Sequence, residues 1–222
     1  MRGPLFVSFE GIDGSGKTTQ VALLAEYLKR QGRSVRVFRE PGGTVLGERI
    51  RELVLDGGEV VPWAEVSLFA AARAQLVAHE LRPTLEGGSD VICDRYLDSS
   101  VAYQGLARSL GADAVLEWSL RVTDGLLPDV TFLLAIGAEQ ASRRVDAPST
   151  AARSVSPATV PDRLEREPRS FRGRVVDAYR QLALRFPERI VSLDAELPTA
   201  SVAEQVREHV ASLLCSEPMV AR

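Results

Sequence analysis

A glycine-rich segment at residues 11–18, Gly-Ile-Asp-Gly-Ser-Gly-Lys-Thr, constrains the fold of this 222-residue chain more than any other feature. A short apolar run at residues 5–10 precedes it, and residues 17–31 follow with Val21, Leu24 and Leu28 at helical spacing. Between a strand and a helix, glycines let backbone N–H groups wrap a phosphate, and the helix directs its positive end at the same anion. The segment therefore matches the Walker A pattern of phosphate-binding loops.

Side chains within this loop have separate predicted roles. Lys17 can reach the β- and γ-phosphates of ATP, and the Thr18 hydroxyl can hold Mg²⁺. A triphosphate repels a carboxylate, so Asp13 is expected to face away from it, toward a donor such as a sugar hydroxyl; the alternative is a turn residue that bonds its own backbone. The variable loop positions carry no cation, so further positive charge must come from elsewhere. The residues predicted to bind ATP are Gly11, Ile12, Asp13, Gly14, Ser15, Gly16, Lys17, Thr18 and Thr19.

Short β-branched and aromatic runs alternate with longer amphipathic stretches along the chain. The predicted strands are residues 5–10, 35–39, 91–94, 130–136 and 190–194. The predicted helices are residues 17–31, 46–55, 65–81, 112–122 and 202–214. Nearly all-apolar strands alternating with helices predict an α/β fold of the P-loop NTPase type, a doubly wound parallel sheet of about five strands with helices on both faces.

The length favours a single domain over residues 1–222, with a lid insertion around residues 143–163. Residues 146–161 are rich in Ala, Ser, Thr and Pro and show no apolar period. Unstructured loops of this length are uncommon in compact domains and are often lids or disordered inserts. We therefore expect the lid to occupy this part of the chain.

Composition excludes several classes of partner. The net charge is −3, from 27 Lys and Arg against 30 Asp and Glu, so nucleic acid is not an expected partner. Two cysteines, Cys93 and Cys215, are too few for a disulfide framework. No apolar run of 18 residues exists, so no membrane partner is expected and the chain is predicted to be cytoplasmic. Only Lys17 and Lys29 are lysines, so arginine supplies nearly all the positive charge.

A second candidate site follows the strand predicted at residues 91–94. In open α/β sheets the ligand crevice lies beyond the carboxyl ends of the strands, where the phosphate loop also lies. Asp94, the last strand residue, is therefore a candidate partner of Mg²⁺ or its water shell. The planar guanidinium of Arg95, the next residue, suits a second phosphate. The alternative is a surface salt bridge at a strand end.

Aromatic and polar side chains at helical spacing suggest where an acceptor base could bind. Phe69 and Arg73 lie four residues apart, so a ring able to stack on a pyrimidine shares a helix face with a guanidinium able to donate to a base carbonyl. The alternatives are a core Phe69 and a solvated Arg73. The turn at residues 39–44 adds Arg39 and Pro41 at the same sheet edge. Helical spacing also brings together a further set of polar and aromatic side chains: Ser99, Ser100, Tyr103 and Gln104. The alternative for this set is a capped helix with a core tyrosine.

Together these segments resemble the thymidylate kinase (dTMP kinase) family of P-loop nucleoside monophosphate kinases. The Walker A match is generic to P-loop proteins, whereas Arg-Glu-Pro-Gly-Gly-Thr followed by Asp-Arg-Tyr is specific to this family. The resemblance extends from about residue 5 to residue 214. The matching stretches are residues 9–20, 39–44, 68–73, 94–96, 102–105 and 162–165, with Phe171, Arg174 and Tyr179.

The resemblance implies a kinase domain that phosphorylates dTMP to dTDP by in-line transfer from ATP with Mg²⁺, serving dTTP synthesis, usually as a homodimer. It places Asp13 near the sugar 3′-hydroxyl, Phe69 on thymine, Arg73 at a thymine carbonyl and Arg95 at the dTMP phosphate. It also places Ser100 and Gln104 near the base, and Tyr103 against the 2′ position. The full predicted acceptor set is Asp13, Arg39, Pro41, Phe69, Arg73, Arg95, Ser99, Ser100, Tyr103 and Gln104.

The lid half departs from the family pattern. Ala135 stands where members commonly have an aspartate, and Arg169 and Arg172 stand where aromatic residues are common. In family members whose phosphate loop lacks an arginine, the lid supplies one. In this chain Arg143 and Arg163 are candidates for that arginine, in addition to Arg144 and Arg153. The predicted catalytic residues are Lys17, Asp13, Arg95, Arg144 and Arg153. The alternatives are a kinase of another pyrimidine nucleotide or of a deoxynucleoside, and a weakly active ATP-binding paralogue.

Overall fold

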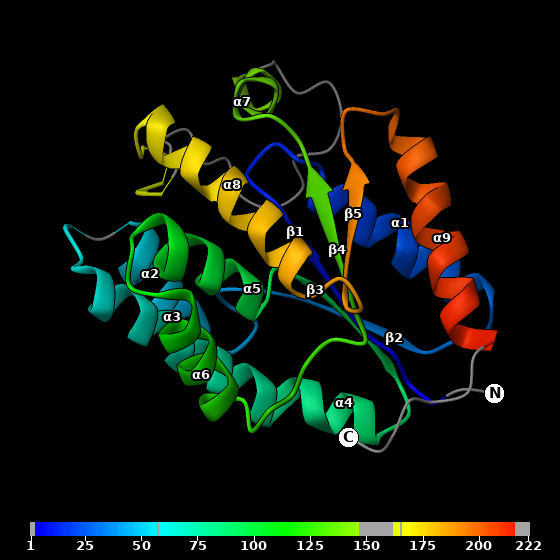
Figure 1. Ribbon diagram of the computed structural model, residues 1–222. Helices are drawn as coiled ribbons and strands as arrows, with labels where there is room; N and C mark the ends of the chain where they lie inside the picture. The colour runs from blue at the N-terminus through cyan, green and yellow to red at the C-terminus, as the bar shows by residue number, and fades with distance from the viewer. Residues whose placement is uncertain (1–2, 57, 147–161, 165, 216–222) are drawn as a thin grey trace.

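A computed structural model of the chain describes residues 3–56, 58–146, 162–164 and 166–215. Within these ranges, five strands form one all-parallel sheet in the order β2-β3-β1-β4-β5 (Figure 1). The fold class predicted from the sequence is confirmed, and each strand lies within one residue of its predicted bounds. The strands are β1 (Phe6–Glu10), β2 (Val35–Arg39), β3 (Asp90–Asp94), β4 (Val130–Ala135) and β5 (Ile190–Asp194).

Helices cover both faces of the sheet. Helices α1 (Lys17–Arg30) and α9 (Thr199–Cys215) pack together on one face, and α8 (Arg169–Arg185) crosses the other, with further helices stacked beyond it (Figure 1). None of the described helices is long and apolar enough to span a membrane. The remaining elements are α2 (Val45–Leu55), α3 (Pro62–Leu76), α4 (Arg82–Glu86), α5 (Leu97–Ser100), α6 (Ala112–Val122), α7 (Ala138–Asp146) and the π-helical segments η1 (Val77–Leu81) and η2 (Val101–Ala107).

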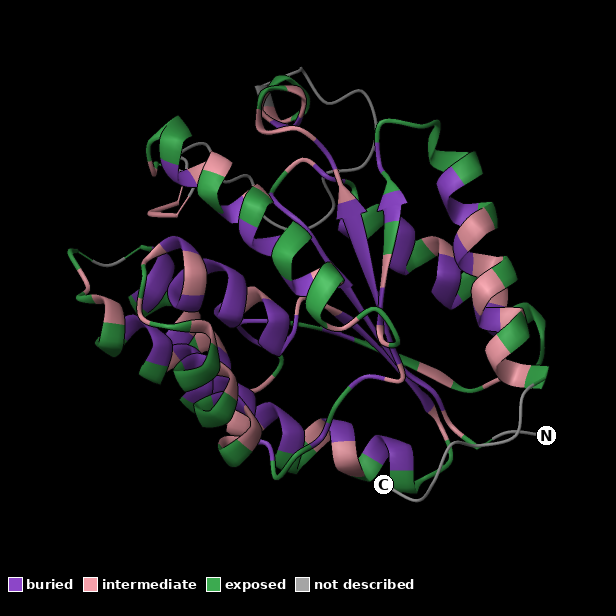
Figure 2. Ribbon diagram, viewed as in Figure 1, coloured by how far each residue is buried: buried purple, intermediate pink, exposed green. Residues whose placement is uncertain are grey.

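The core lies around the central strands β1, β3 and β4. All five residues of β1 are buried, and its Phe9 ring packs against Phe132 of β4 with centroids 5.4 Å apart. Figure 2 shows buried residues along the sheet and on the helix faces turned toward it. Burial on both faces explains why these strands read as continuous apolar runs rather than alternating ones.

The long helix predicted at residues 65–81 has a different form in the structure. It begins earlier, at Pro62, and it changes from α-helix to a π-helical segment over η1 before continuing as α4. Pro83 lies just beyond η1 and has no backbone N–H to donate to the preceding turn. A wider turn at this point accommodates the missing donor, as is common where a helix bends.

The strand register places the candidate site residues at one edge of the sheet. Asp94 at the end of β3 pairs with Phe9 of β1 on one side and with Arg39 of β2 on the other. The segments that follow these three strands therefore emerge side by side. They carry the phosphate loop, the Asp94–Arg95 corner and Glu40, which explains how distant parts of the sequence form one site.

Candidate active site

The phosphate loop connects β1 to α1 and depends on glycine at its first position. Gly11 has φ 139°, and a Cβ there would lie 2.8 Å from both the Leu134 carbonyl oxygen and Ser15 Oγ. Lys17 Nζ turns back into the loop and donates to the carbonyls of Gly11 and Ile12, both at 3.1 Å. Burial lowers the pKa of Lys17. These two hydrogen bonds hold the Lys17 ammonium group over the loop, and a bound phosphate can replace the two carbonyls as acceptor.

The two residues predicted to hold Mg²⁺ are in direct contact. Thr18 Oγ1, in the first turn of α1, donates to Asp94 Oδ2 at 2.6 Å. No group of three or more His, Cys, Asp or Glu residues that could bind a metal occurs in the described part of the chain. Mg²⁺ usually takes one or two protein oxygens and completes its shell with water and substrate phosphates. A hydroxyl beside a carboxylate next to the phosphate loop fits that donor set.

Asp13 and Arg95 form the link between the loop and the rest of the site. Arg95 Nη2 donates to Asp13 Oδ1 at 2.5 Å, and Arg95 Nη1 donates to the Gly11 carbonyl at 3.0 Å. Partial desolvation alone would raise the pKa of the half-exposed Asp13, but the charges of Arg95 and Lys17 lower it to about 2. The carboxylate expected to face a hydroxyl thus faces two cations, with Lys17 Nζ 3.7 Å away.

Arg95 is held in an unusual conformation by a buried network that the sequence did not predict. Its φ is 72°, in the left-handed region, and such strain persists only where surrounding contacts enforce it. Tyr179 Oη lies 3.4 Å from Arg95 Nη1 and donates to Glu10 at 2.8 Å. Glu10 also accepts from Ser99 Oγ at 2.6 Å. Burial, and then the charge of Asp98, raise the pKa of Glu10.

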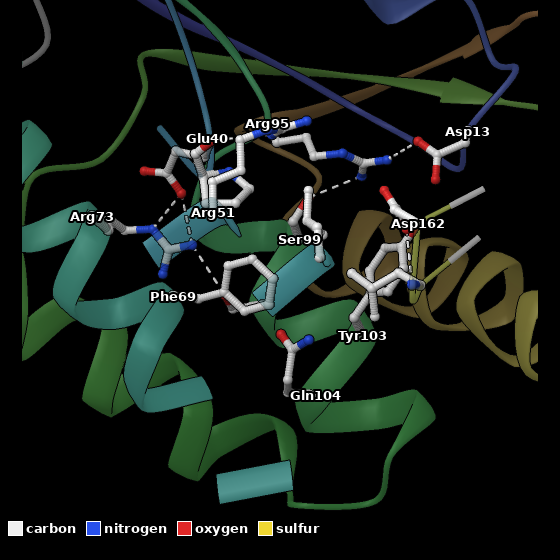
Figure 3. Close-up of a pocket in the computed structure, with 14 residues that line it drawn as sticks. Asp13, Glu40, Arg51, Phe69, Arg73, Arg95, Ser99, Tyr103, Gln104 and Asp162 are labelled. Atoms are coloured by element: carbon white, nitrogen blue, oxygen red, sulfur yellow. Dashed lines mark hydrogen bonds and ion pairs between the residues drawn. The ribbon is translucent and has the colours of Figure 1, made fainter. Parts of the chain in front are cut away.

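A cavity of about 100 Å³ extends from Arg95 toward α3 and η2 (Figure 3). In Figure 3, Asp13 and Arg95 lie at one end, while Arg73, Phe69 and Gln104 lie at the other. Nine residues of the predicted acceptor set line this cavity: Asp13, Pro41, Phe69, Arg73, Arg95, Ser99, Ser100, Tyr103 and Gln104. The cavity is also lined by five residues that were not predicted from the sequence: Glu40, Arg51, Leu55, Asp162 and Leu164.

The end of the cavity away from the loop is built around a buried ion pair. Arg73 is 1% exposed, so the alternative of a solvated Arg73 is wrong. Its Nε donates to Glu40 Oε2 at 2.8 Å, and its Nη2 donates to Ser100 Oγ at 3.0 Å. Burial raises the pKa of Glu40 to about 7. Glu40 Oε1 has no hydrogen-bond partner among the described residues, which leaves one buried acceptor at this end.

Arg39 is the member of the predicted acceptor set that does not line the cavity. Arg39 Nη2 donates to Glu48 at 2.9 Å instead. Side chains alternate in direction along a strand, so Glu40 and not Arg39 turns inward where β2 ends. The arginine that does reach the cavity is Arg51 of α2, which donates to the Pro41 carbonyl at 3.0 Å. Arg51 lies three and four residues before the buried Val54 and Leu55 of α2. This helical spacing is the sequence signal that could have indicated that Arg51 points inward.

The arginines predicted to serve the lid have different positions. Arg144 lines a separate cavity of about 50 Å³ beside the start of α1, together with Ser15 and Thr199. Arg143 is exposed and pairs with Glu139. Arg163 pairs with the buried carboxylate of Glu65. Arg153 lies outside the described residues, as does most of the predicted lid insertion.

Arg172 in the first turn of α8 faces the phosphate loop. It lines a cavity of about 110 Å³ with Asp13, Ile12 and Val175, and its charge contributes to the lowered pKa of Asp13. Arg172 Nη1 donates to Ser142 Oγ of α7 at 3.1 Å. Residues 172, 175 and 179 share one helix face. Arg172, which stands where the family commonly has an aromatic residue, therefore brings a positive charge to the phosphate loop.

Comparisons with known proteins agree on one family. Residues 9–206 match the family described as thymidylate kinase. The thymidylate kinase of Leifsonia xyli is 48% identical over 207 residues, covering 93% of this chain and 94% of the relative. That of Caldanaerobacter subterraneus is 42% identical over 215 residues, covering 96% and 98%. The crystal structure of thymidylate kinase from Ehrlichia chaffeensis superposes with a TM-score of 0.71 at 30% identity, covering 94% of this chain and 99% of that one.

Proposed function

Because the chain belongs to the thymidylate kinase family, we propose that the phosphate loop and the cavity beside it are the two halves of one active site. The reaction is the ATP-dependent phosphorylation of dTMP to dTDP. The loop takes the ATP phosphates and the cavity takes dTMP. The family match carries the reaction, and the geometry supports the assignment of each residue to a substrate.

The observation that most supports this assignment is that Asp13 and Arg95 belong to both halves. Arg95 contacts the loop carbonyl of Gly11 and also lines the cavity. A phosphate bound by Arg95 at the near end of the cavity would lie next to a γ-phosphate held over Lys17. Holding two reactants side by side in this way is most of what phosphoryl transfer requires from a protein.

In the proposed transfer, an oxygen of the dTMP phosphate attacks the γ-phosphorus of ATP. A new oxygen–phosphorus bond forms while the bond from the γ-phosphorus to the β–γ bridging oxygen breaks, and ADP leaves with that electron pair. Lys17 neutralises charge on the β- and γ-phosphates, and Arg95 holds the acceptor phosphate. Arg172 adds positive charge on the same side of the loop. Both Lys17 and Arg95 exchange their present oxygen partners for phosphate oxygens.

The far end of the cavity suits a pyrimidine base. The ring of Phe69, 9% exposed, offers a face for stacking, and Arg73 offers guanidinium donors beside it. Tyr103 lies between the two ends, with the Arg95 guanidinium 5.5 Å from its ring centroid. Its ring leaves little room beside the sugar, which favours a deoxyribose over a ribose.

The donor nucleotide and its metal are assigned to the opposite side of the loop. The cavity lined by Arg144, Ser15 and Thr199 adjoins the start of α1, and we assign it to the base or ribose of ATP. Thr18 and Asp94 would hold Mg²⁺, which when bound neutralises charge on the β- and γ-phosphates. This assignment moves Arg144 from the transferring phosphoryl group, where the sequence analysis placed it, to the donor nucleotide.

A homodimer and a cytoplasmic location remain part of the proposal. Large apolar side chains on α2, α3 and α6 are exposed, with Leu53 at 59%, Trp63 at 50% and Trp118 at 42%. Exposed apolar side chains on neighbouring helices are typical of subunit interfaces. Light scattering of the purified chain tests the dimer: a mass of one chain, about 24.1 kDa, would contradict it.

One assay tests the proposed reaction and its alternatives together. Mg-ATP is mixed in turn with dTMP, dUMP, UMP, dCMP and thymidine, and the ADP formed is measured. We expect dTMP to give the highest kcat/KM and thymidine to give almost none, because thymidine lacks the phosphate that Arg95 binds. Acceptor-independent ADP formation, or none with any acceptor, would overturn the kinase assignment. A Lys17→Ala variant is the control for activity from contaminating kinases.

A further inference from the structure

The carboxylate of Glu10, the last residue of β1, accepts four hydrogen bonds within the described part of the chain, all from segments around Arg95. The backbone amides of Tyr96 and Ser99 donate to Oε1 at 2.7 and 3.2 Å. The hydroxyls of Ser99 and Tyr179 donate to Oε2 at 2.6 and 2.8 Å. Glu10 is 1% exposed and is not among the residues that line the cavity assigned to dTMP. Its hydrogen bonds therefore act on the site through other residues.

The bonds to Oε1 help to fix the backbone on both sides of Arg95. The Arg95 N–H donates to the Phe9 carbonyl at 2.9 Å, and the next N–H, that of Tyr96, donates to Glu10. The last two residues of β1 thus hold two consecutive N–H groups, and Arg95 at this point has φ 72°. A non-glycine residue keeps such a conformation only where surrounding contacts enforce it. Glu10 therefore helps to set the direction in which the Arg95 side chain leaves the backbone.

The bonds to Oε2 fix the hydroxyl groups that hold the Arg95 guanidinium. Arg95 Nη1 donates to Ser99 Oγ at 3.2 Å, as Figure 3 shows, and to Tyr179 Oη at 3.4 Å. A guanidinium can only donate, so both hydroxyl oxygens accept from it and direct their hydrogens elsewhere. Glu10 Oε2 takes both hydrogens. The carboxylate thereby keeps lone pairs of two hydroxyl oxygens turned toward Arg95.

The two sides of the guanidinium have different kinds of partner. Nη1 faces the buried hydroxyls and the Gly11 carbonyl, whereas Nη2 donates to Asp13, whose side chain is 46% exposed. In the proposed function, Nη2 exchanges Asp13 for the acceptor phosphate. The hydroxyls that Glu10 orients can stay bonded to Nη1 during this exchange. They anchor the buried side of the guanidinium while its other side is presented to the phosphate.

We propose that Glu10 is a positioning residue for the acceptor phosphate, which holds Arg95 in the orientation that binds the phosphate of dTMP. The proposal rests on the proposed function, in which Arg95 binds that phosphate. The contacts of Glu10 converge on the phosphate end of the cavity, so their loss should weaken the binding of a ligand through its phosphate alone. Thymidine has the base and the sugar of dTMP without the phosphate, so it is the reference ligand.

The test compares the dissociation constants of dTMP and thymidine, measured by calorimetry, in the unaltered chain and in Glu10→Gln. The glutamine carbonyl can accept from the two backbone amides, but its NH₂ group then faces the hydroxyls of Ser99 and Tyr179. These hydroxyls would meet donors on both sides and could no longer hold Arg95. We expect the Kd for dTMP to rise roughly tenfold or more, with that for thymidine nearly unchanged. A proportional rise for both ligands, or an unchanged Kd for dTMP, would overturn the proposal.

A double-variant cycle tests whether Glu10 acts through Arg95. Arg95→Ala removes the guanidinium, so adding Glu10→Gln to it should not weaken dTMP binding further. If the two residues acted independently, their separate effects on the Kd would multiply in the double variant. Multiplied effects would therefore contradict a positioning role.

The matched control is Glu40→Gln. Glu40 is also a buried carboxylate, but it lines the cavity itself and accepts from Arg73 at 2.8 Å at the base end. Because dTMP and thymidine carry the same base, the ratio of their dissociation constants should equal that of the unaltered chain. A change in this ratio as large as in Glu10→Gln would assign the effect to the loss of any buried carboxylate and contradict the proposal.

A second variant covers the case in which Glu10→Gln fails to fold. Tyr179→Phe keeps the buried ring and removes one of the two hydroxyls between Glu10 and Arg95. We expect the Kd for dTMP to rise several-fold and that for thymidine to stay constant, and an unchanged ratio would contradict the proposal. Failure of the proposed function is distinguishable from both results, because the unaltered chain would then bind dTMP no more tightly than thymidine.

Discussion

The two ends of the cavity that we assign to dTMP hold their charged side chains in different ways. At the base end, Arg73 and Glu65 are buried in ion pairs that a bound base can leave intact. At the phosphate end, Lys17 and Arg95 are paired with loop carbonyls and with Asp13, whose side chain is 46% exposed. In the proposed function, phosphate oxygens replace these partners of Lys17 and Arg95. On this proposal, the base end is formed before substrate arrives, and the phosphate end exchanges its contacts on binding.

This difference separates selectivity from reactivity. A fixed set of donors and acceptors discriminates between bases because an incorrect base leaves buried groups unpaired. At the other end, Lys17 and Arg95 already have hydrogen-bond acceptors, so their charges are compensated before a phosphate binds. These acceptors also hold the two cations in the positions proposed for phosphate binding. We therefore expect substitutions at the base end to change stability and base preference, and those at the phosphate end to change turnover and phosphate binding.

The largest expected effect is at the phosphate end, on turnover. Lys17→Ala removes the ammonium group that we propose neutralises the β- and γ-phosphates, and kcat should fall about 10³-fold. Because the polar partners of Lys17 in the described structure are loop carbonyls and the half-exposed Asp13, the unfolding midpoint should change little. Steady-state ADP formation and thermal unfolding of the same preparation check both statements. Activity close to that of the unaltered chain would contradict the role of Lys17.

The next effect is at the base end, on stability. Arg73→Met leaves Glu40 buried without its partner and should lower the free energy of unfolding by about 3 kcal/mol. Arg95→Met should lower it clearly less, because the partner Asp13 is far more exposed than Glu40. Urea unfolding of the two variants measures the difference. Equal losses would mean that the two ends do not differ in the way described.

A third substitution separates acceptor binding from donor binding. Arg95→Ala should raise the KM for dTMP roughly 100-fold, because a charge-assisted pair of hydrogen bonds to the phosphate is lost. The KM for ATP should stay nearly constant, since the donor is held by the loop and α1. Initial rates with each substrate varied in turn provide the test. An unchanged KM for dTMP would count against a monophosphate acceptor.

The smallest expected effect is the pH dependence of the base end. Burial raises the pKa of Glu40 from 4.5 to about 7, so the folded chain binds this proton more tightly than the unfolded chain. The stabilisation is complete below pH 4.5 and is lost as the pH rises through 7. From pH 5 to pH 7, the unaltered chain should lose about 2 kcal/mol relative to Glu40→Gln. Urea unfolding at several pH values measures this; a difference that does not vary with pH would show that Glu40 does not titrate in this range.

Local sequence patterns predicted the sheet, the phosphate loop and most of the cavity lining. These features depend on short-range spacing or on which residues follow a strand. Long-range contacts were not predictable in the same way, because the partners of Glu10 and Glu65 lie up to 169 residues away in the chain. Helix α8 was missed for a different reason. Its buried stripe, which includes Phe171, Val175 and Tyr179, has helical spacing, but interleaved arginines obscure the apolar period.

The direct test of the difference between the two ends is a crystal structure of the chain with dTMP bound. We predict that Arg73 Nε remains within hydrogen-bond distance of Glu40 and that Gln104 Nε2 remains bonded to Glu65, as in the structure described above. Arg95 should leave Asp13 and donate to the dTMP phosphate. The opposite result, with Arg95 still paired to Asp13 and Arg73 or Gln104 separated from its carboxylate, would contradict the account.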